Sequence, residues 1–355
     1  MTKLIESQLN FIFERLGFHP ARRAMKSQFK RSFPKGKKEM FADIITLAAS
    51  DASHGSFIEG CGESCVHLGS RHIELYSVKD AVRKSNLKKF FSDLKLSTNV
   101  VLKKAYPFPI TDQGVLAKIK KNQVHPMEKG VLDINGQQYQ YVVLSTVTEH
   151  ELEMDGSPYL NKTGQDLVKN DDVYFYYVTK EYRQLFHILY WDEAGETAIL
   201  SVDRNGLSVH QSRDQLFLTK NYIEQLTIGV LGNPLNVFDA IDPLYRAADG
   251  RIVRLGHVTS DGNPVRLKLS RGQVCLKQDK YHGAGEGGGY VHAKFAVGKS
   301  WSFGLADERT VVEIDLAGKA AMLDTAQPLS DFSVLKCSRL KDLDFAIKNV
   351  RPFAV

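Results

Sequence analysis

Apolar residues recur at helical spacing at both ends of the chain. Over residues 4–16 they follow one another at intervals of one, three or four positions, and a glycine comes directly after the last of them. Such a stripe, closed by glycine, predicts an amphipathic helix. Proline is tolerated in the first turn of a helix and disfavours helix in the residue before it, so a second helix is predicted over residues 21–33, between Pro20 and Pro34. The pattern of residues 338–350 predicts a closing helix.

The rest of the first third mixes two patterns. Alternation of apolar and polar residues is typical of strands, whereas apolar stripes at intervals of three and four predict helices. Helices are predicted over residues 78–94 and 111–122, and strands over residues 40–49, 64–68, 71–78 and 97–105.

Strand patterns dominate beyond residue 125. Asn135-Gly136 lies between two alternating runs, and this dipeptide is the strongest short signal for a β-hairpin. A helix is predicted over residues 213–226, and strands over 131–144 (as the hairpin), 172–180, 185–193, 196–203, 206–212, 250–258, 264–270, 273–277 and 290–297.

These elements predict an α+β fold with mostly antiparallel sheets and a C-terminal helix. Because a chain of 355 residues is longer than a single hydrophobic core usually accommodates, we expect three regions. They are a mixed α/β region over residues 1–125, a β-hairpin-rich α+β domain over 126–240, and a β-meander domain over 241–355 with a Gly-rich loop and the closing helix.

The composition excludes several protein classes. No apolar run reaches the roughly 18 residues that a membrane helix needs. Glu6 and Glu14 interrupt the first apolar stretch, which therefore lacks the layout of a signal peptide. Four cysteines are too few for a disulfide scaffold in a chain of this length, so we expect a reducing, cytoplasmic location.

Charge is distributed unevenly along the chain. The net charge is +6, but residues 1–125 hold 22 Lys and Arg against 11 Asp and Glu, a net of +11. The remaining residues hold 25 against 30, a net of −5. A basic region on a mildly acidic remainder favours a polyanionic partner for the basic part.

The densest basic stretch predicts a nucleic-acid-binding surface, with DNA favoured over RNA. Positive charges that lie close together repel one another, and phosphates relieve that repulsion with release of counterions. The candidate binding residues are Arg22, Arg23, Lys26, Lys30, Arg31, Lys35, Lys37 and Lys38, followed by Lys88 and Lys89. The plainer interpretation is a solvated face that keeps the protein soluble. The functional alternative is an assembly scaffold without catalytic activity, in which the chain forms a homodimer.

The first third also resembles the core of the PD-(D/E)XK nucleases in the predicted order of its helices and strands. The resemblance implies that Asp43 and Glu74 bind Mg²⁺, with Glu59 as a further carboxylate and Lys79 as the lysine of the site. A metal-dependent endonuclease is therefore one hypothesis for the activity. The sequence departs from the family pattern because Tyr76 stands two positions after Glu74, where the family has lysine.

A second metal hypothesis concerns zinc. Cys61, Cys65, His67 and His72 supply the four sulfur and nitrogen ligands of a structural zinc site. Half-buried cysteines and surface histidines account for the same residues without a metal.

Residues 283–289 contain five glycines and match G-x-G-x-x-G. A dinucleotide-binding turn must open a helix, whereas the residues that follow alternate like a strand. The stretch therefore predicts a flexible loop between two strands, and such a loop can become ordered on a phosphate-bearing ligand.

Aromatic residues gather in the predicted strands between residues 172 and 193. They are Tyr174, Phe175, Tyr176, Tyr177, Tyr182, Phe186, Tyr190 and Trp191. Because their surroundings are neutral to acidic, we expect a protein core or a subunit interface rather than a platform for stacked bases.

Overall fold

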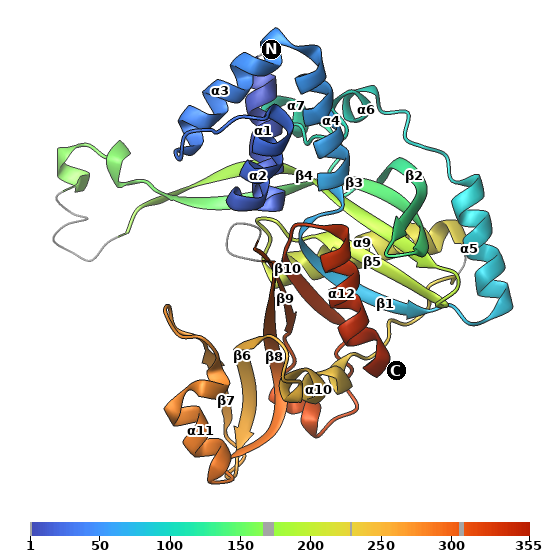
Figure 1. The fold of residues 1–355 in the computed structure, drawn as a ribbon, viewed down its shortest axis with the longest axis vertical. Helices are drawn as coiled ribbons and strands as arrows, with labels where there is room; N and C mark the ends of the chain where they lie inside the picture. The colour runs from blue at the N-terminus through green and yellow to red at the C-terminus, as the bar shows by residue number, and fades with distance from the viewer. Residues whose placement is uncertain (1, 166–173, 228, 305–308) are drawn as a thin grey trace.

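The computed structural model describes residues 2–165, 174–227, 229–304 and 309–355. Within these ranges, ten strands form one antiparallel sheet in the order β2-β3-β4-β5-β1-β10-β9-β8-β6-β7 (Figure 1). The strands are β1 Gly69–Ser77, β2 His125–Ile134, β3 Gln137–Asp155, β4 Tyr176–Asp192, β5 Thr197–Asp203, β6 Arg251–Thr259, β7 Pro264–Lys268, β8 Val291–Phe303, β9 Thr310–Leu316 and β10 Asp331–Cys337. The predicted α+β class is confirmed, and so is the C-terminal helix.

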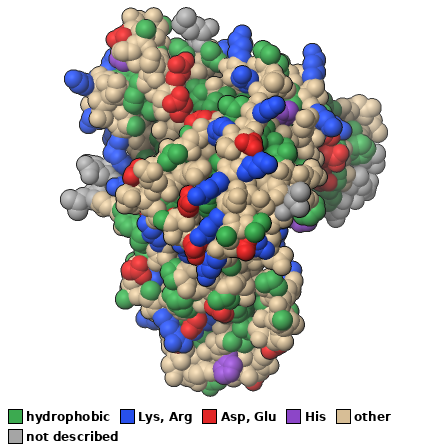
Figure 2. Space-filling view, turned by 90° about the vertical axis from the view of Figure 1, so that its right-hand side faces the viewer, with side chains coloured by type: hydrophobic (Ala, Val, Ile, Leu, Met, Phe, Trp, Pro, Cys, Tyr) green, Lys and Arg blue, Asp and Glu red, His purple; other side chains and the backbone are tan. Residues whose placement is uncertain are grey.

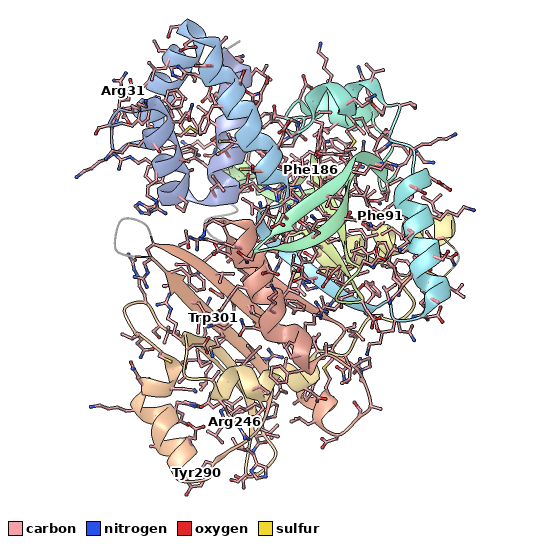
Figure 3. The ribbon with its side chains drawn as sticks, turned by 45° about the vertical axis from the view of Figure 1, so that its right-hand side comes forward. Arg31, Phe91, Phe186, Arg246, Tyr290 and Trp301 are labelled. Carbon is pink, nitrogen blue, oxygen red and sulfur yellow. The ribbon has the colours of Figure 1, made fainter. Side chains whose placement is uncertain are left out.

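Helices cover both faces of this sheet. The helices are α1 Thr2–Leu16, α2 Phe18–Phe29, α3 Lys37–Ser50, α4 Ala52–Val66, α5 Ala81–Asp93, α6 Val100–Ala105, α7 Gln113–Lys118, α9 Val209–Thr227, α10 Ile241–Arg246, α11 Lys280–Gly287 and α12 Leu340–Val350. Helices α1 to α4 form a cap whose core is continuous with one face of the sheet and with α12. Helices α5 and α9 pack on the opposite face of β1, β3, β4 and β5. Phe186 of β4 belongs to the core on the cap side of the sheet, and Phe91 of α5 belongs to the core on the opposite side (Figure 3).

Strand β1 joins the three sequence regions into one sheet. Its residues pair with β5 on one side and with β10 on the other, so Glu74 lies between Leu200 and Asp331. The boundaries expected at residues 125 and 240 therefore separate strands of the same sheet.

Three strand predictions in the first third are wrong. Residues 40–49 lie in α3, 64–68 fall at the end of α4, and 97–105 contain α6. In α3, the buried residues Met40, Phe41 and Ile44 have helical spacing, and packing on the cap outweighs the strand preference of the Ile-Ile-Thr run.

Other predictions beyond residue 125 also need correction. Residues 176–180 and 185–192 of the two predicted runs, 172–180 and 185–193, belong to one long strand, β4. Residues 172 and 173 lie outside the described residues. Residues 206–212 contain the start of α9, and 273–277 form no strand. The hairpin at Asn135-Gly136 is confirmed, since both residues adopt the positive φ values that a tight turn between β2 and β3 requires.

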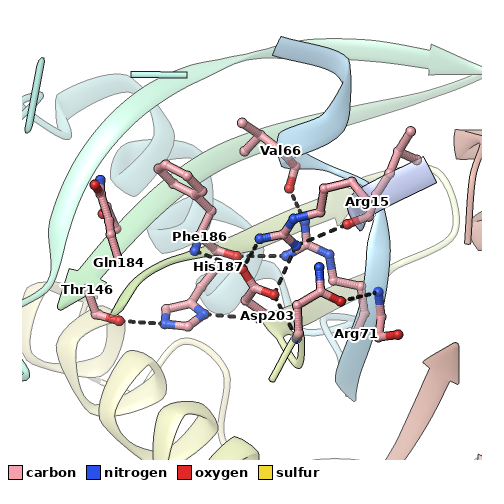
Figure 4. Close-up of polar contacts among 12 residues, drawn as sticks. Arg15, Val66, Arg71, Thr146, Gln184, Phe186, His187 and Asp203 are labelled. Carbon is pink, nitrogen blue, oxygen red and sulfur yellow. Dashed lines mark hydrogen bonds and ion pairs between the residues drawn. The ribbon is translucent and has the colours of Figure 1, made fainter. Parts of the chain in front are cut away.

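A buried ionic network fixes the cap on the sheet (Figure 4). Arg15 of α1 donates two hydrogen bonds to the carboxylate of Asp203 on β5, one of them 2.9 Å long. Arg71 of β1 lies beside them and donates to the carbonyls of Phe186 and Val66. Burial alone would raise the pKa of Asp203, but the two guanidinium groups hold it below its usual value. Asp203 is therefore charged and depends on both arginines.

Replacing Arg15 with Met is expected to lower the free energy of unfolding by about 3–5 kcal/mol, because a buried carboxylate loses its direct partner. Chemical denaturation measures this change. Arg31→Met is the control, since Arg31 and Asp43 form an exposed pair 3.7 Å apart that is expected to contribute less than about 1 kcal/mol. Equal losses in the two variants would contradict the role of the network.

Two buried histidines are held neutral. His67 lies 2.9 Å from the hydroxyl of Tyr190, and burial lowers its pKa to about 3. His187 accepts a hydrogen bond from the backbone N–H of Asp203 at Nδ1, so its proton resides on Nε2, which faces Thr146. Burial lowers the pKa of His187 to about 4. Both side chains gain a proton when the chain unfolds at mildly acidic pH.

The free energy of unfolding is therefore expected to fall by roughly 2 kcal/mol per histidine when the pH is lowered from about 7.5 to about 5. The unfolded pKa is about 6.5, so this stability is fully present above that pH and is lost as the pH falls toward the folded values. Urea denaturation at both pH values measures the loss. His187→Gln should weaken the pH dependence, whereas His210→Gln, at an exposed position, should leave it unchanged. A pH-independent unfolding free energy would contradict the prediction.

Candidate nucleic-acid interface

The basic residues of the first third form separate groups on different helices. One group occupies α2, the following loop and the start of α3, and another occupies α5, at the opposite side of the molecule (Figure 1). A third lies near α6 and α7. We call the first group the α2–α3 basic surface, which consists of Arg22, Arg23, Lys26, Lys30, Arg31, Lys35, Lys37 and Lys38.

Packing of α2 explains why these charges point outward. Ala21 and Met25, four residues apart, are buried against the cap. Phe33 is buried in the loop after α2, and its carbonyl accepts a hydrogen bond 2.6 Å long from Arg22. Arg22 therefore positions the loop. Arg31 lies at the outer edge of the cap (Figure 3).

Most lysines of the α2–α3 basic surface lack a counter-charge. In the part of the chain that the structure describes, Lys26, Lys30, Lys35 and Lys38 are exposed and have no ion-pair or hydrogen-bond partner. Arg23 has a partner within the fold. The unpaired charges keep their full hydration and repel one another, which favours binding of a polyanion.

Two acidic side chains border this surface. Asp43 lies 3.7 Å from Arg31, and both side chains are well exposed. Glu39 stands in the first turn of α3, with its carboxylate close to Gly36. The amino-terminal turn of α3 has no side-chain cap at Gly36, and the Glu39 carboxylate beside it offsets part of the positive potential of the backbone N–H groups.

The α5 group is balanced by acids instead. Lys88 pairs with Glu193 at 2.5 Å, and Lys84 pairs with Glu196 at 2.6 Å. Figure 2, which views the molecule from this side, shows Lys and Arg interleaved with Asp and Glu. Lys89 borders a groove between α5 and α9. For α5, the interpretation as a solvated face fits better than a polyanion site.

The four residues of the nuclease hypothesis do not converge. Asp43 lies on α3 and Glu59 is exposed on α4, both in the cap. Glu74 lies on the other face of β1, where it accepts a hydrogen bond from Tyr76, and burial raises its pKa. Lys79 is exposed before α5.

No carboxylate pair of the PD-(D/E)XK type is therefore assembled by these residues. Within residues 2–165, 174–227, 229–304 and 309–355, no group of three or more His, Cys, Asp and Glu is arranged to hold a metal ion.

The four residues of the zinc hypothesis also have separate surroundings. Cys61 and Cys65 lie one turn apart on α4, and burial raises their pKa values to about 11 and about 12. His67 faces Tyr190, whereas His72 lies 2.8 Å from Ser333 and 3.2 Å from the carboxylate of Asp331, both on β10. The thiols stay protonated, and the imidazoles have partners of their own.

The contact between His72 and Asp331 belongs to a network that sequence patterns did not predict. Arg213 of α9 donates two hydrogen bonds, of 2.8 and 2.9 Å, to Asp331. Burial opposes ionisation of Asp331, but His72 and Arg213 lower its pKa to about 2. The two hydrogen bonds from Arg213 tie α9 to β10. Ser333 is almost fully buried, so its hydroxyl is not an accessible nucleophile.

The glycine-rich stretch is mostly a helix. Residues 280–287 form α11, whose first turn is capped by Asp279, so the prediction of a flexible loop is wrong there. His282 is buried and lies 2.9 Å from the hydroxyl of Tyr245, which donates to Glu286 at 2.8 Å. These contacts hold α11 on α10. The strand predicted after the glycines is confirmed as β8.

The aromatic run divides into two parts along β4. Phe186, Tyr190 and Trp191 are buried, as expected for a core. Tyr174, just before β4, and Tyr176 are 72% and 60% exposed. Among the described residues this end of β4 pairs with β3 alone, and the two strands project from the body of the molecule (Figure 1).

The sequence matches no protein-family model and no curated protein. In the described ranges, no helix has the length and apolar character needed to span a membrane.

Proposed function

We propose that the protein binds nucleic acid through the phosphate backbone, and that the α2–α3 basic surface makes the contact. The observation that carries the proposal is the group of exposed lysines on this surface that have no ion-pair or hydrogen-bond partner among the described residues. DNA remains the favoured partner and RNA the second. Cleavage is not part of the proposal, because Asp43 and Glu74 lie on different sides of the sheet.

The arrangement of this surface supports backbone contacts rather than base readout. Its lysines extend from α2, the following loop and the start of α3, and the hydrogen bond between Arg22 and the carbonyl of Phe33 fixes the loop. Flexible lysines neutralise phosphates without requiring a particular base. A cytoplasmic location belongs to the same proposal and is supported by the four cysteines, all of which are free thiols.

Replacing Lys26, Lys30, Lys35 and Lys38 together with Gln is expected to weaken binding to a duplex by about tenfold or more and to reduce the salt dependence of affinity. Fluorescence anisotropy across a salt series, with DNA and RNA of equal length, measures both quantities. The matched control replaces Lys84, Lys88, Lys89 and Lys95, which removes the same charge from the α5 side.

Equal losses in the two variants would show that only total charge matters, and no affinity at low salt in the wild type would reject the proposal. Glu39→Gln gives an independent readout, because removal of this acid should tighten binding.

A second candidate function is assembly, favoured by the projecting arm of β3 and β4. Two-stranded ribbons are marginally stable alone in water. The exposed apolar residues of the arm are Leu152, Met154, Tyr159, Tyr174, Phe175, Tyr176 and Val178. Residues 149–182 also contain eight Asp and Glu against three Lys, which disfavours nucleic acid as a partner for the arm. The partner we propose is a second copy of this net-basic chain.

Replacing Met154 and Tyr176 with Ser is expected to raise the dissociation constant of a homodimer by about tenfold or more, since both side chains would be covered in it. Sedimentation velocity over a concentration series measures this change. Leu4→Ser, at another exposed apolar position, is the control. A monomeric wild type at all concentrations would contradict the assembly role.

A further inference from the structure

A pocket with a cavity volume of about 430 Å³ lies where α6, the end of α7 and the start of β2 meet. Cavities of this order hold small-molecule ligands in proteins. The lining residues are Asn99, Val101, Val115, Lys118, Ile119, Lys120, Gln123 and His125. No acidic residue is among them, so the pocket is positively charged.

The two lysines of the pocket lack partners within the fold. Lys118 and Lys120 are exposed, and the described part of the chain supplies neither an ion pair nor a hydrogen bond to them. The neighbouring Lys121 behaves differently, since it donates to three carbonyls at the end of α7. Lys121 therefore stabilises the helix end, whereas Lys118 and Lys120 leave two ammonium groups for a ligand.

Two uncharged side chains that carry donor groups also line the pocket. The carboxamide oxygen of Asn99 accepts the N–H groups of Val101 and Leu102, which leaves its NH₂ group for other acceptors. His125 is only 9% exposed, and its Nδ1 lies 3.3 Å from the hydroxyl of Ser97. Its Nε2 is buried and has no hydrogen-bond partner among the described residues.

A buried unpaired imidazole nitrogen is costly, and an acceptor from a ligand removes that cost. Burial lowers the pKa of His125, so the ring of the unliganded protein is neutral at neutral pH. When Nδ1 accepts from Ser97, Nε2 carries the proton and is a donor. Lys118, Lys120 and His125 thus offer two charged donors and one neutral donor.

Three of the lining residues, Val101, Val115 and Ile119, are apolar. Val101 is 46% exposed, whereas Ile119 is largely buried. An apolar wall next to a cationic end suits a ligand that has an anionic group at one end and a flat or apolar body at the other.

We infer that this pocket binds a phosphomonoester about the size of a nucleoside monophosphate. The phosphate contacts Lys118, Lys120 and His125, and the base or another apolar body lies on Val101 and Ile119. The phosphate source is either a free mononucleotide or the terminal phosphate of an oligonucleotide. The pocket shares no residue with the α2–α3 basic surface, so the inference does not depend on the proposed function.

Isothermal titration calorimetry of the full chain with AMP, orthophosphate and adenosine tests the inference. AMP is expected to bind most tightly, and Lys118→Gln combined with Lys120→Gln should weaken it by about tenfold or more. Lys103→Gln combined with Lys104→Gln is the matched control, since these lysines of α6 do not line the pocket. Equal binding of AMP and adenosine, or equal losses in the two double variants, would overturn the inference.

His125 provides a readout that a merely structural residue would not give. Since a phosphate favours the protonated ring, AMP should raise the pKa of His125 in an NMR titration, and AMP affinity should rise as the pH falls. His125→Gln keeps a donor near Nε2 and should bind AMP more tightly than His125→Phe. An unchanged pKa of His125 in the presence of saturating AMP would overturn its assigned contact.

Oligonucleotides with a 5′-phosphate and a 5′-hydroxyl distinguish the two sources. If the phosphorylated form binds more tightly and the double variant of Lys118 and Lys120 abolishes the difference, the ligand is the terminal phosphate of an oligonucleotide. If both forms bind equally while AMP binds, the ligand is a free mononucleotide. The fourfold variant of the α2–α3 basic surface should bind AMP as the wild type does. If it loses AMP affinity equally, the pocket is not a separate site.

Discussion

The ion pair between Arg15 and Asp203 is the interaction on which the arrangement of this molecule depends. It joins the first helix to a strand 188 residues later, and Arg71 of the central strand β1 completes it. Removing these charges from water costs several kcal/mol per ion, and only short, multiple contacts offset that cost. The pairing therefore specifies one position of the cap on the sheet.

The position of the α2–α3 basic surface follows from that constraint. Gly17, with a φ of 80°, lets the chain turn directly from α1 into α2. Any shift of α1 would carry α2 and the loop held by Arg22 with it. The buried network thus positions the surface, and the exposed lysines make the proposed contacts with nucleic acid.

The perturbed pKa values of the core groups mark stability rather than chemistry. Burial keeps His67 and His187 neutral and Cys65 protonated, while Asp203 and Asp331 stay charged through arginine or histidine partners. All of these groups are buried and already bonded or packed within the core. The proposed contacts with ligands lie instead at the periphery, on the α2–α3 basic surface, the β3–β4 arm and the pocket beside β2.

The sequence by itself determined the elements whose cause is local. Apolar spacing predicted α1 and α12, and the flanking prolines predicted α2, although α2 ends at Phe29 rather than at residue 33. Asn135-Gly136 predicted the β2–β3 hairpin because positive φ values are available to these residues at little cost. It did not determine that residues 40–49 form a helix, since packing of Met40 and Ile44 on the cap outweighed a strand-like run. Tertiary structure alone decided which lysines are paired, that Asp43 and Glu74 stay apart, and that β1 lies between β5 and β10. Those outcomes depend on burial and charge contacts between residues far apart in the chain, and no local pattern encodes them.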